Sequence, residues 1–210
     1  MPESIREPSE QERFWQGAFG DEYVERNDGA KLVASNLALF SKALARAGGV
    51  SSVIELGTNR GLNLIALHQL LPFCRFQGVE INTRAHAAAS ALGIADVWHG
   101  SLFDYPITRQ HDLALIKGVL IHLSPELLSA AYAKLMAASR RWILIAEYYN
   151  PTPVEVPYRG NRDRLFKRDF AGEMLDLYPE LQLADYGFCY QRDPIFPGGD
   201  CTWFLLEKRG

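Results

Sequence analysis

The sequence of 210 residues is short of features that would each mark a specialised class of protein. It has only three cysteines, Cys74, Cys189 and Cys201, which lie far apart and form no C-x-x-C pair. An odd number of widely spaced cysteines indicates reduced intracellular thiols rather than a disulfide framework or a zinc site. The histidines likewise form no H-x-x-x-H or carboxylate–histidine cluster, so we expect no metal ion.

Long apolar runs are also missing. Typical examples, 143–146 (ILIA) and 203–206 (WFLL), are far too short to cross a membrane. The chain opens with the polar, acidic stretch MPESIREPSEQER, whereas a secretory signal peptide is basic and then apolar. We therefore expect a cytoplasmic protein that does not act at a membrane.

A surplus of positive charge is absent as well. The formal net charge of -3 argues against a protein built mainly to bind nucleic acid. This charge is uneven, because residues 1–30 contain eight acidic and three basic residues. The rest of the chain is slightly basic, so a small anionic substrate remains compatible with the composition.

Strand-like apolar segments alternate with helix-like segments from residue 30 onward. We predict helices over 30–47, 61–71, 83–92, 125–138 and 167–178, and strands over 52–57, 75–81, 95–100, 111–118, 141–149, 182–191 and 201–208. This alternation predicts an α/β, Rossmann-like, doubly wound fold with a mostly parallel seven-stranded sheet. Only a turn at 197–199 separates the last two strands, so they should form a C-terminal antiparallel hairpin.

Residues 1–29 lie outside this pattern and contain four aromatic residues. We interpret them as an N-terminal helical lid over the ligand site of a domain spanning 30–210. Trp15, Tyr23, Arg26 and Asn27 would then reach the bound ligand. The alternative is a helix that packs on the edge of the sheet without touching a ligand.

The loops after the first four strands carry the residues expected to bind a ligand. In open α/β sheets a ligand lies beyond the carboxyl ends of the strands, where a glycine turn admits it and a strand-end acid binds a ribose. The spacing E-x-G-x-x-x-G after the first strand differs from the dinucleotide fingerprint G-x-G-x-x-G. The candidate cofactor-binding residues in these loops are Glu55, Gly57, Thr58, Asn59, Gly61, Glu80, Ile81, Asn82, Ser101, Leu102, Phe103, Lys117 and Gly118.

Together these residues resemble the class I S-adenosylmethionine-dependent methyltransferases. The resemblance implies that S-adenosyl-L-methionine is the cofactor, with its methionine part at Gly57, its ribose at Glu80 and its adenine at Ser101 and Leu102. It places Lys117 beside the sulfonium. The segments 14–27, 117–126, 147–173 and 185–193 look, more narrowly, like the pseudaminic acid biosynthesis-associated methylase family.

The end of the fifth strand offers the candidate catalytic residues. Glu147, Tyr148, Tyr149 and Asn150 follow one another at the edge where a substrate pocket is expected. We assign catalysis to Glu147, Tyr149 and Asn150, together with His122 after the fourth strand, and substrate contact to Tyr148. The alternatives are structural. Glu147 could anchor the loop, the tyrosines could pack in the core, and His122 could cap the turn at 124.

A basic loop follows this strand, and it suggests that the substrate carries a carboxylate or phosphate. Tyr158, Arg159 and Arg168 belong to it, and Arg159 is the preferred anion-binding residue because its forked donors match such groups. Tyr186 is a further candidate for substrate binding. The alternative is a solvated loop whose charged side chains pair with one another and with the acidic residues of segment 1–30.

The functional prediction is methyl transfer from S-adenosylmethionine to a small anionic metabolite that bears an amine or hydroxyl, of the amino acid or nucleotide sugar type. One alternative uses the cofactor as substrate, cyclising it to azetidine-2-carboxylate and methylthioadenosine. A second is a non-catalytic cofactor-binding module that partners another enzyme. The sequence does not indicate an oligomeric state.

Overall fold

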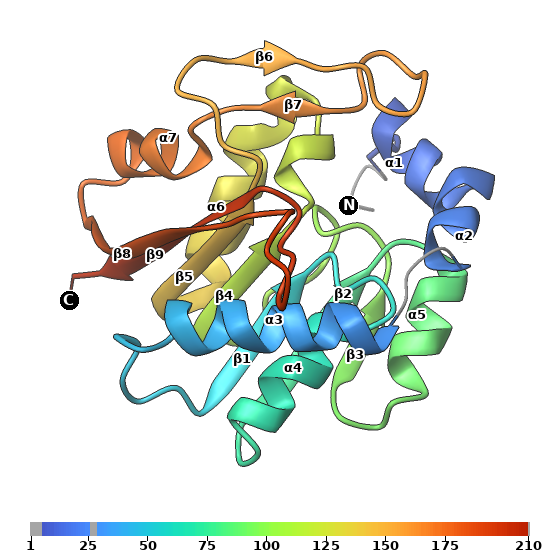
Figure 1. Ribbon diagram of the computed structural model, residues 1–210. Coiled ribbons are helices and arrows are strands. Elements are labelled where there is room, and N and C mark those ends of the chain that lie inside the picture. Colours follow the sequence, from blue (N-terminus) through green and yellow to red (C-terminus); the bar gives the residue numbers. More distant parts are fainter. Residues whose placement is uncertain (1–5, 26–28, 210) are drawn as a thin grey trace, which may run out of the picture.

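The computed structural model describes residues 6–25 and 29–209 (Figure 1). Its centre is a seven-stranded sheet in the order β3-β2-β1-β4-β5-β9-β8. The first five are parallel, β9 runs antiparallel to β5, and β8 runs antiparallel to β9. This confirms the predicted doubly wound sheet with its C-terminal hairpin. The strands are β1 (Ser52–Leu56), β2 (Arg75–Glu80), β3 (Asp96–His99), β4 (His111–Lys117), β5 (Ser139–Glu147), β8 (Leu181–Cys189) and β9 (Cys201–Lys208).

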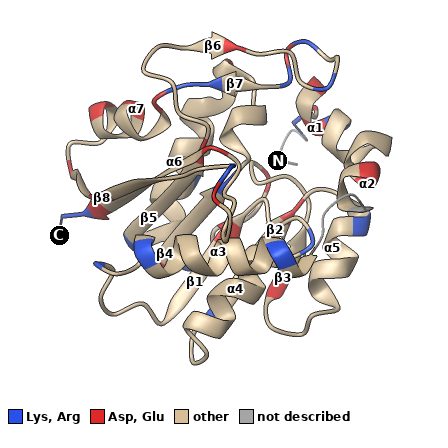
Figure 2. Cartoon of the chain, in the orientation of Figure 1, with Lys and Arg blue, Asp and Glu red and all other residues tan. Residues whose placement is uncertain are grey.

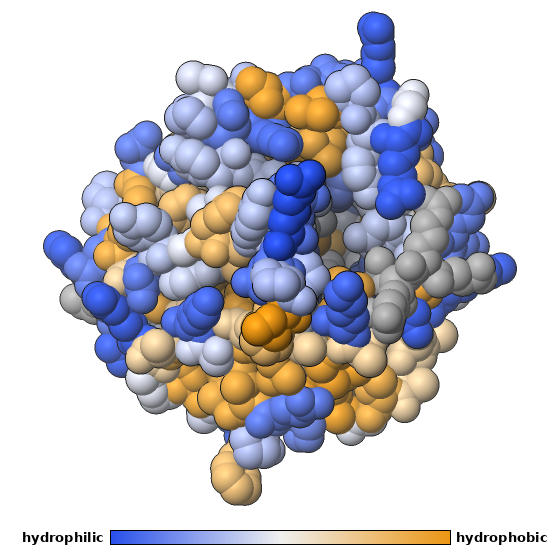
Figure 3. Space-filling view, in the orientation of Figure 1, coloured by the Kyte–Doolittle hydropathy of each residue, from blue (hydrophilic) through white to orange (hydrophobic). Residues whose placement is uncertain are grey.

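Helices cover both faces of the sheet and bury two apolar clusters. Leu39 and Phe40 of one helix pack with Leu67 of another against one face, and Tyr132 and Met174 belong to the cluster on the other face. The helices of the first face are α3 (Gly29–Ala43) and α4 (Leu62–Leu70), and those of the second are α6 (Leu128–Ala138) and α7 (Phe170–Leu177). Figure 3 shows apolar surface over α3 and α4 on the lower part of the view.

Local capping fixes where several helices begin. Ser9 precedes α1 (Glu10–Gln16) and forms a reciprocal capping box with Glu12. Asn82 caps α5 (Thr83–Ser90) by accepting from the amide of Ala85. The helix α2 (Ala18–Glu25) follows α1 directly, and Figure 1 shows α2 between α1 and α5 at the edge of the sheet.

The segment 150–169 differs from its prediction. It contains a short hairpin of β6 (Val154–Glu155) and β7 (Phe166–Lys167) where only a loop was expected. The prediction that a helix begins at Lys167 is wrong, because Asp169 caps α7 by accepting from the amide of Gly172. Lys167 therefore belongs to a strand, and its charge does not oppose the dipole of that helix.

The turn before α6 also differs in detail. Pro125 opens a 3-10 turn, η2 (Pro125–Leu127), as its position after Ser124 predicts, but the Ser124 side chain makes no capping hydrogen bond. Another 3-10 turn, η1 (Leu120–His122), follows β4. In the described part of the chain, no helix combines the length and apolar character that a membrane crossing requires.

Candidate functional site

A cavity of about 370 Å³ lies at the carboxyl ends of the parallel strands. This volume is near the lower end of the ~300–1,000 Å³ typical of small-ligand sites. Most of the candidates chosen from sequence meet there, from loops that are far apart along the chain. The predicted residues that line it are Trp15, Tyr23, Gly57, Thr58, Asn59, Glu80, Ile81, Asn82, Ser101, Leu102, Phe103, Lys117, Gly118, His122, Glu147, Tyr148 and Tyr158.

The turn after β1 needs its first glycine for both conformation and space. Gly57 has a φ of 85°, which L side chains rarely adopt. A Cβ atom there would lie 2.4 Å from Cγ2 of Val119, which itself lines the cavity. Gly61 has a φ of 81° but does not line the cavity, and a Cβ there would lie 2.5 Å from Leu92. Its role is therefore close packing, unlike the predicted ligand contact.

Glu55 lies behind the cavity wall instead of in it. Its side chain is fully buried, and its Oε1 accepts from Asn63 Nδ2 at 2.6 Å. Asn63 does line the cavity, although the sequence analysis did not select it. Burial raises the pKa of Glu55 to about 8. Glu55, chosen from the sequence as a cofactor-binding residue, therefore reaches the cavity through Asn63.

Glu80 joins the first two loops at the tip of β2. Its carboxylate accepts from the amides of Asn59, at 2.6 Å, and Asn82, at 2.8 Å. Burial raises the pKa of Glu80, and these hydrogen bonds oppose that rise. Because each carboxylate oxygen has two lone pairs, Glu80, which lines the cavity, retains acceptor capacity beyond these two hydrogen bonds.

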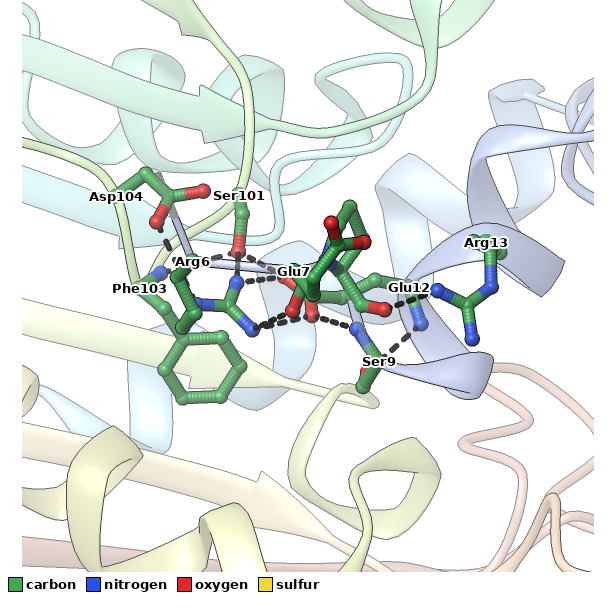
Figure 4. Close-up of polar contacts among 9 residues, drawn as sticks. Arg6, Glu7, Ser9, Glu12, Arg13, Ser101, Phe103 and Asp104 are labelled. Carbon is green, nitrogen blue, oxygen red and sulfur yellow. Dashed lines mark hydrogen bonds and ion pairs between the residues drawn. The ribbon is translucent and has the colours of Figure 1, made fainter. Parts of the chain in front are cut away.

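The N-terminal helix α1 closes the cavity beside Ser101. The carboxylate of Glu12 accepts from the Ser101 hydroxyl and from the guanidinium of Arg6, as Figure 4 shows. Arg6 also lies 3.5 Å from Asp104 and over the ring of Phe103. Burial disfavours the charge of Glu12, but hydrogen bonds from Arg6, Ser101 and Ser9 outweigh it and lower its pKa to about 2. Arg6 and Glu12 were not predicted from the sequence, because only their tertiary contacts distinguish them from other charged residues.

Aromatic rings join the N-terminal helices to the far end of the cavity. The Trp15 ring centroid lies 5.4 Å from that of Tyr23 and 4.7 Å from that of His122. The ring of Tyr158 also packs on His122, and the centroids of these two rings are 4.9 Å apart. The N-terminal helices and the β6–β7 connection therefore meet around one histidine.

His122 has a defined tautomer. Its Nδ1 lies 2.6 Å from the carbonyl oxygen of Arg164, and because a carbonyl only accepts, Nδ1 carries the proton. Burial lowers the pKa of His122 to about 4, so the ring is neutral near pH 7. Nε2 is left as an acceptor on a residue that lines the cavity.

Glu147 anchors the loop after β4 and also lines the cavity. Its Oε1 accepts from the amides of Val119 and Leu120, each at 2.9 Å. Its Oε2 is buried and has no hydrogen-bond partner among residues 6–25 and 29–209. Burial raises the pKa of Glu147 to about 7, against the hydrogen bonds and the nearby charge of Lys117.

Two of the proposed catalytic residues lie away from the cavity. The strand β5 ends at Glu147, two residues before its predicted end, so Tyr149 and Asn150 belong to the loop beyond it. Tyr149 is 41% exposed and packs toward Phe204. Asn150 donates to the carbonyl of Thr152 at 2.6 Å. Neither lines the cavity in the described structure, which removes the basis for their assignment.

Three of the proposed substrate contacts are also outside the lining. Arg159 is exposed, and its guanidinium lies 5.9 Å from the ring centroid of Tyr158. Arg168 is held by Glu173 at 2.7 Å, and Tyr186 is 64% exposed. Figure 2 shows the basic residues of the β6–β7 connection at the periphery, near α1. Arg26 and Asn27 lie outside the described residues.

The fold is similar to several solved methyltransferases. The magnesium protoporphyrin IX methyltransferase of Synechocystis PCC 6803, with S-adenosylhomocysteine bound, is 15% identical, with a TM-score of 0.68 over 94% of this chain and 97% of that one. The 1,6-didemethyltoxoflavin-N1-methyltransferase of Burkholderia thailandensis is 16% identical, with a TM-score of 0.73 over 100% and 94%. The chain has the fold of these methyltransferases.

A third similar structure is a plantazolicin methyltransferase with bound S-adenosylhomocysteine. It is 11% identical, with a TM-score of 0.65 over 95% of this chain and 94% of that one. No family model matches the sequence, and no curated protein sequence matches it. The narrower resemblance to the pseudaminic acid biosynthesis-associated family is therefore not confirmed.

In the residues that the structure describes, no group of three or more His, Cys, Asp and Glu side chains is arranged to hold a metal ion.

Proposed function

We propose that this protein is an S-adenosylmethionine-dependent methyltransferase that acts on a small acceptor. The observation that carries the proposal is one continuous cavity, running from the glycine turn and the β2 acid to a neutral histidine enclosed by aromatic rings. The likeness in fold to methyltransferases supports it.

The residues present fit the proposed cofactor. Gly57 leaves space that a Cβ would fill, and Glu80 keeps free lone pairs at the position suited to a ribose diol. Leu102 and Phe103 offer apolar surface to an adenine ring, with Ser101 beside them. When bound, S-adenosylmethionine supplies a methyl group already activated by a sulfonium.

The chain's own contribution is to position the acceptor and to exclude water. Alignment of the reacting groups accounts for much of the acceleration of such a reaction. Nε2 of His122 accepts the proton that an amine or hydroxyl gives up when it is methylated. Trp15 and Tyr23 close the cavity as parts of an N-terminal lid comprising residues 1–29, with residues 30–210 forming the cofactor-binding domain.

The charged residues around the cavity bear on which chemical groups the acceptor carries. Three carboxylates, Glu12, Glu80 and Glu147, line it, against the two basic residues Arg60 and Lys117. An anionic group was expected because of Arg159 and Arg168, neither of which lines the cavity. We therefore propose an acceptor that bears an amine or hydroxyl, and we no longer expect that it must also carry a carboxylate or phosphate.

The small volume of the cavity favours cyclisation of the cofactor as a second candidate function. A volume of about 370 Å³, closed by α1, leaves little room beside a nucleoside cofactor. This supports intramolecular cyclisation, in which the amine of the cofactor attacks its own γ-carbon. The bond between that carbon and sulfur breaks, so methylthioadenosine leaves and azetidine-2-carboxylate forms.

Product analysis separates these candidates. The protein is incubated with S-adenosylmethionine alone, and then with panels of amino acids, amines and nucleotide sugars. S-adenosylhomocysteine formed only with an acceptor supports methyl transfer, whereas methylthioadenosine formed without one supports cyclisation. Cofactor binding without either product would support a non-catalytic module.

A further inference from the structure

Cys189 and Cys201 face each other at the end of the C-terminal hairpin where its connecting loop begins and ends. Cys189 is the last residue of β8 and Cys201 the first residue of β9, and the two are directly paired in the strand register. Directly opposed residues of antiparallel strands have Cα atoms about 4.5–5.5 Å apart and side chains on one face. Disulfides have Cα separations of about 4.4–6.8 Å, so the backbone already suits a bond between them.

Cys189 and Cys201 both carry free thiols in the structure. Cys201 is buried and Cys189 is partly exposed, so a small oxidant reaches Cys189 first. Burial raises the pKa of Cys201 to about 12 against the charge of Lys117, and the nearby charges of Glu147 and Cys189 add to this rise. Cys74, the third cysteine, lies one residue before β2 and donates from its thiol to the carbonyl of Val50 at 3.1 Å.

The loop that the two cysteines enclose forms part of the cavity wall. Pro197, Gly198 and Gly199 line the cavity, and so does Cys201 itself. The loop folds back onto the hairpin, because a Cβ on Gly198 would lie 2.1 Å from Cβ of Cys189. A bond between the cysteines would therefore hold the loop at its base in the position seen here.

We propose that Cys189 and Cys201 are a dithiol modification site, and that its oxidation to a disulfide fixes the loop 190–200 against the cavity. The oxidant is a small disulfide such as glutathione disulfide. The thiolate of Cys189 attacks one sulfur, the disulfide bond of the oxidant breaks, and one glutathione leaves. The thiolate of Cys201 then displaces the second glutathione. Two protein thiols are oxidised, and one glutathione disulfide is reduced to two thiols.

The effect on ligand binding rests on the proposed function. Because the disulfide selects the arrangement in which the loop lines the cavity, it favours the state that holds the cofactor. We expect S-adenosylmethionine to bind the oxidised protein at least about fivefold more tightly than the reduced protein, the lower end of usual coupling between sites.

The first test needs no cofactor. The full chain is treated with glutathione disulfide, and then digested with trypsin under non-reducing conditions. Arg192 lies between the two cysteines and is exposed, so cleavage there leaves the peptides of Cys189 and Cys201 joined only if the disulfide has formed. Mass spectrometry should find this linked pair in the wild type and in C74S, and should not find it in C189S or C201S. Cys74 in a mixed disulfide with no linked pair would overturn the proposal.

The second test compares S-adenosylmethionine affinity before and after oxidation in C74S and in C74S/C189S. We expect tighter binding on oxidation in C74S alone, reversed by a thiol reductant. A linked pair with unchanged affinity would overturn the effect on the loop. A linked pair in a protein that binds no S-adenosylmethionine would leave the dithiol assignment standing and would instead contradict the proposed function.

Discussion

The carbonyl oxygen of Arg164 lies 2.6 Å from Nδ1 of His122 and holds the proton on that nitrogen, which leaves Nε2 as the acceptor of the ring. The side chain of Arg164 meanwhile contacts the N-terminal arm, pairing with Glu10 and lying 5.0 Å from the ring centroid of Phe14. One residue of the β6–β7 connection therefore contacts both the proposed base and the proposed lid.

Replacing His122 should reduce turnover without abolishing binding. H122N keeps a side chain that can donate to the carbonyl of Arg164, but it removes the acceptor at Nε2. We expect kcat to fall by about 10²–10⁴-fold, the usual contribution of a general base, with the Kd for S-adenosylmethionine little changed. Single-turnover kinetics and calorimetry measure the two quantities. A variant as active as the wild type would remove His122 from the chemistry.

The pH dependence of activity should reflect the lowered pKa of His122. With that pKa at about 4, the ring is neutral and able to accept a proton throughout pH 5–8. Protonation of His122 should therefore cause no loss of kcat/KM until the pH approaches 4. An inflection near pH 6.5 that is present in the wild type and absent in H122N would show that His122 titrates as an ordinary histidine.

Loss of the Arg164 side chain should loosen the arm and leave the histidine tautomer intact, because the carbonyl belongs to the backbone. R164Q removes the pair with Glu10 and the contact with Phe14. We expect faster proteolysis within residues 6–25 and a higher KM, with a smaller change in kcat. R162Q, at an exposed arginine of the same loop, is the matched control and should behave like the wild type. Equal proteolysis of both variants would show that the Arg164 side chain does not hold the N-terminal helices in place.

Glu147 should make stability depend on pH in a predictable direction. Its pKa is about 7 in the folded protein and near 4.5 when unfolded, so between these values the folded state binds more protons. The stability that this carboxyl contributes is therefore present below about pH 4.5 and is lost as the pH rises through 7. E147Q keeps an acceptor for Val119 and Leu120 and removes the buried charge. Its advantage over the wild type in free energy of unfolding should therefore increase by on the order of 2 kcal/mol between pH 5 and pH 8.

Denaturant unfolding of the wild type and E147Q at pH 5 and pH 8 measures this difference. E126Q, at an exposed glutamate, is the control and should show no such gain. The same difference between E147Q and the wild type at both pH values would contradict the account of this buried carboxyl.

Much of the fold could be predicted because it follows from local patterns. Buried strands, glycine turns and strand-end acids such as Glu80 are visible along the sequence, and the topology of parallel strands brings their ends together. The substrate side was less predictable. Whether Tyr149 faces the cavity depends on where β5 ends, and that end was misplaced by two residues.

The contacts of the N-terminal arm depend on tertiary packing. The capping box of Ser9 and Glu12 has a local signature, but nothing local shows that Glu12 also accepts from Ser101, which is far away in sequence. The charges of the loop 158–168 were equally ambiguous. Exposed arginines pair with neighbouring acids as readily as they bind a ligand, and Arg168 pairs with Glu173.

Direct binding of S-adenosylmethionine, measured by calorimetry on the wild type, E80Q and E126Q, tests the central claim most directly. Thermal unfolding of each variant serves as the check on folding, because Glu80 also accepts from the amides of Asn59 and Asn82. The account predicts saturable binding with one site in the wild type and in E126Q, and affinity at least about tenfold weaker in a folded E80Q, the loss of one charge-assisted hydrogen bond. A folded wild-type protein that binds neither S-adenosylmethionine nor S-adenosylhomocysteine would contradict it.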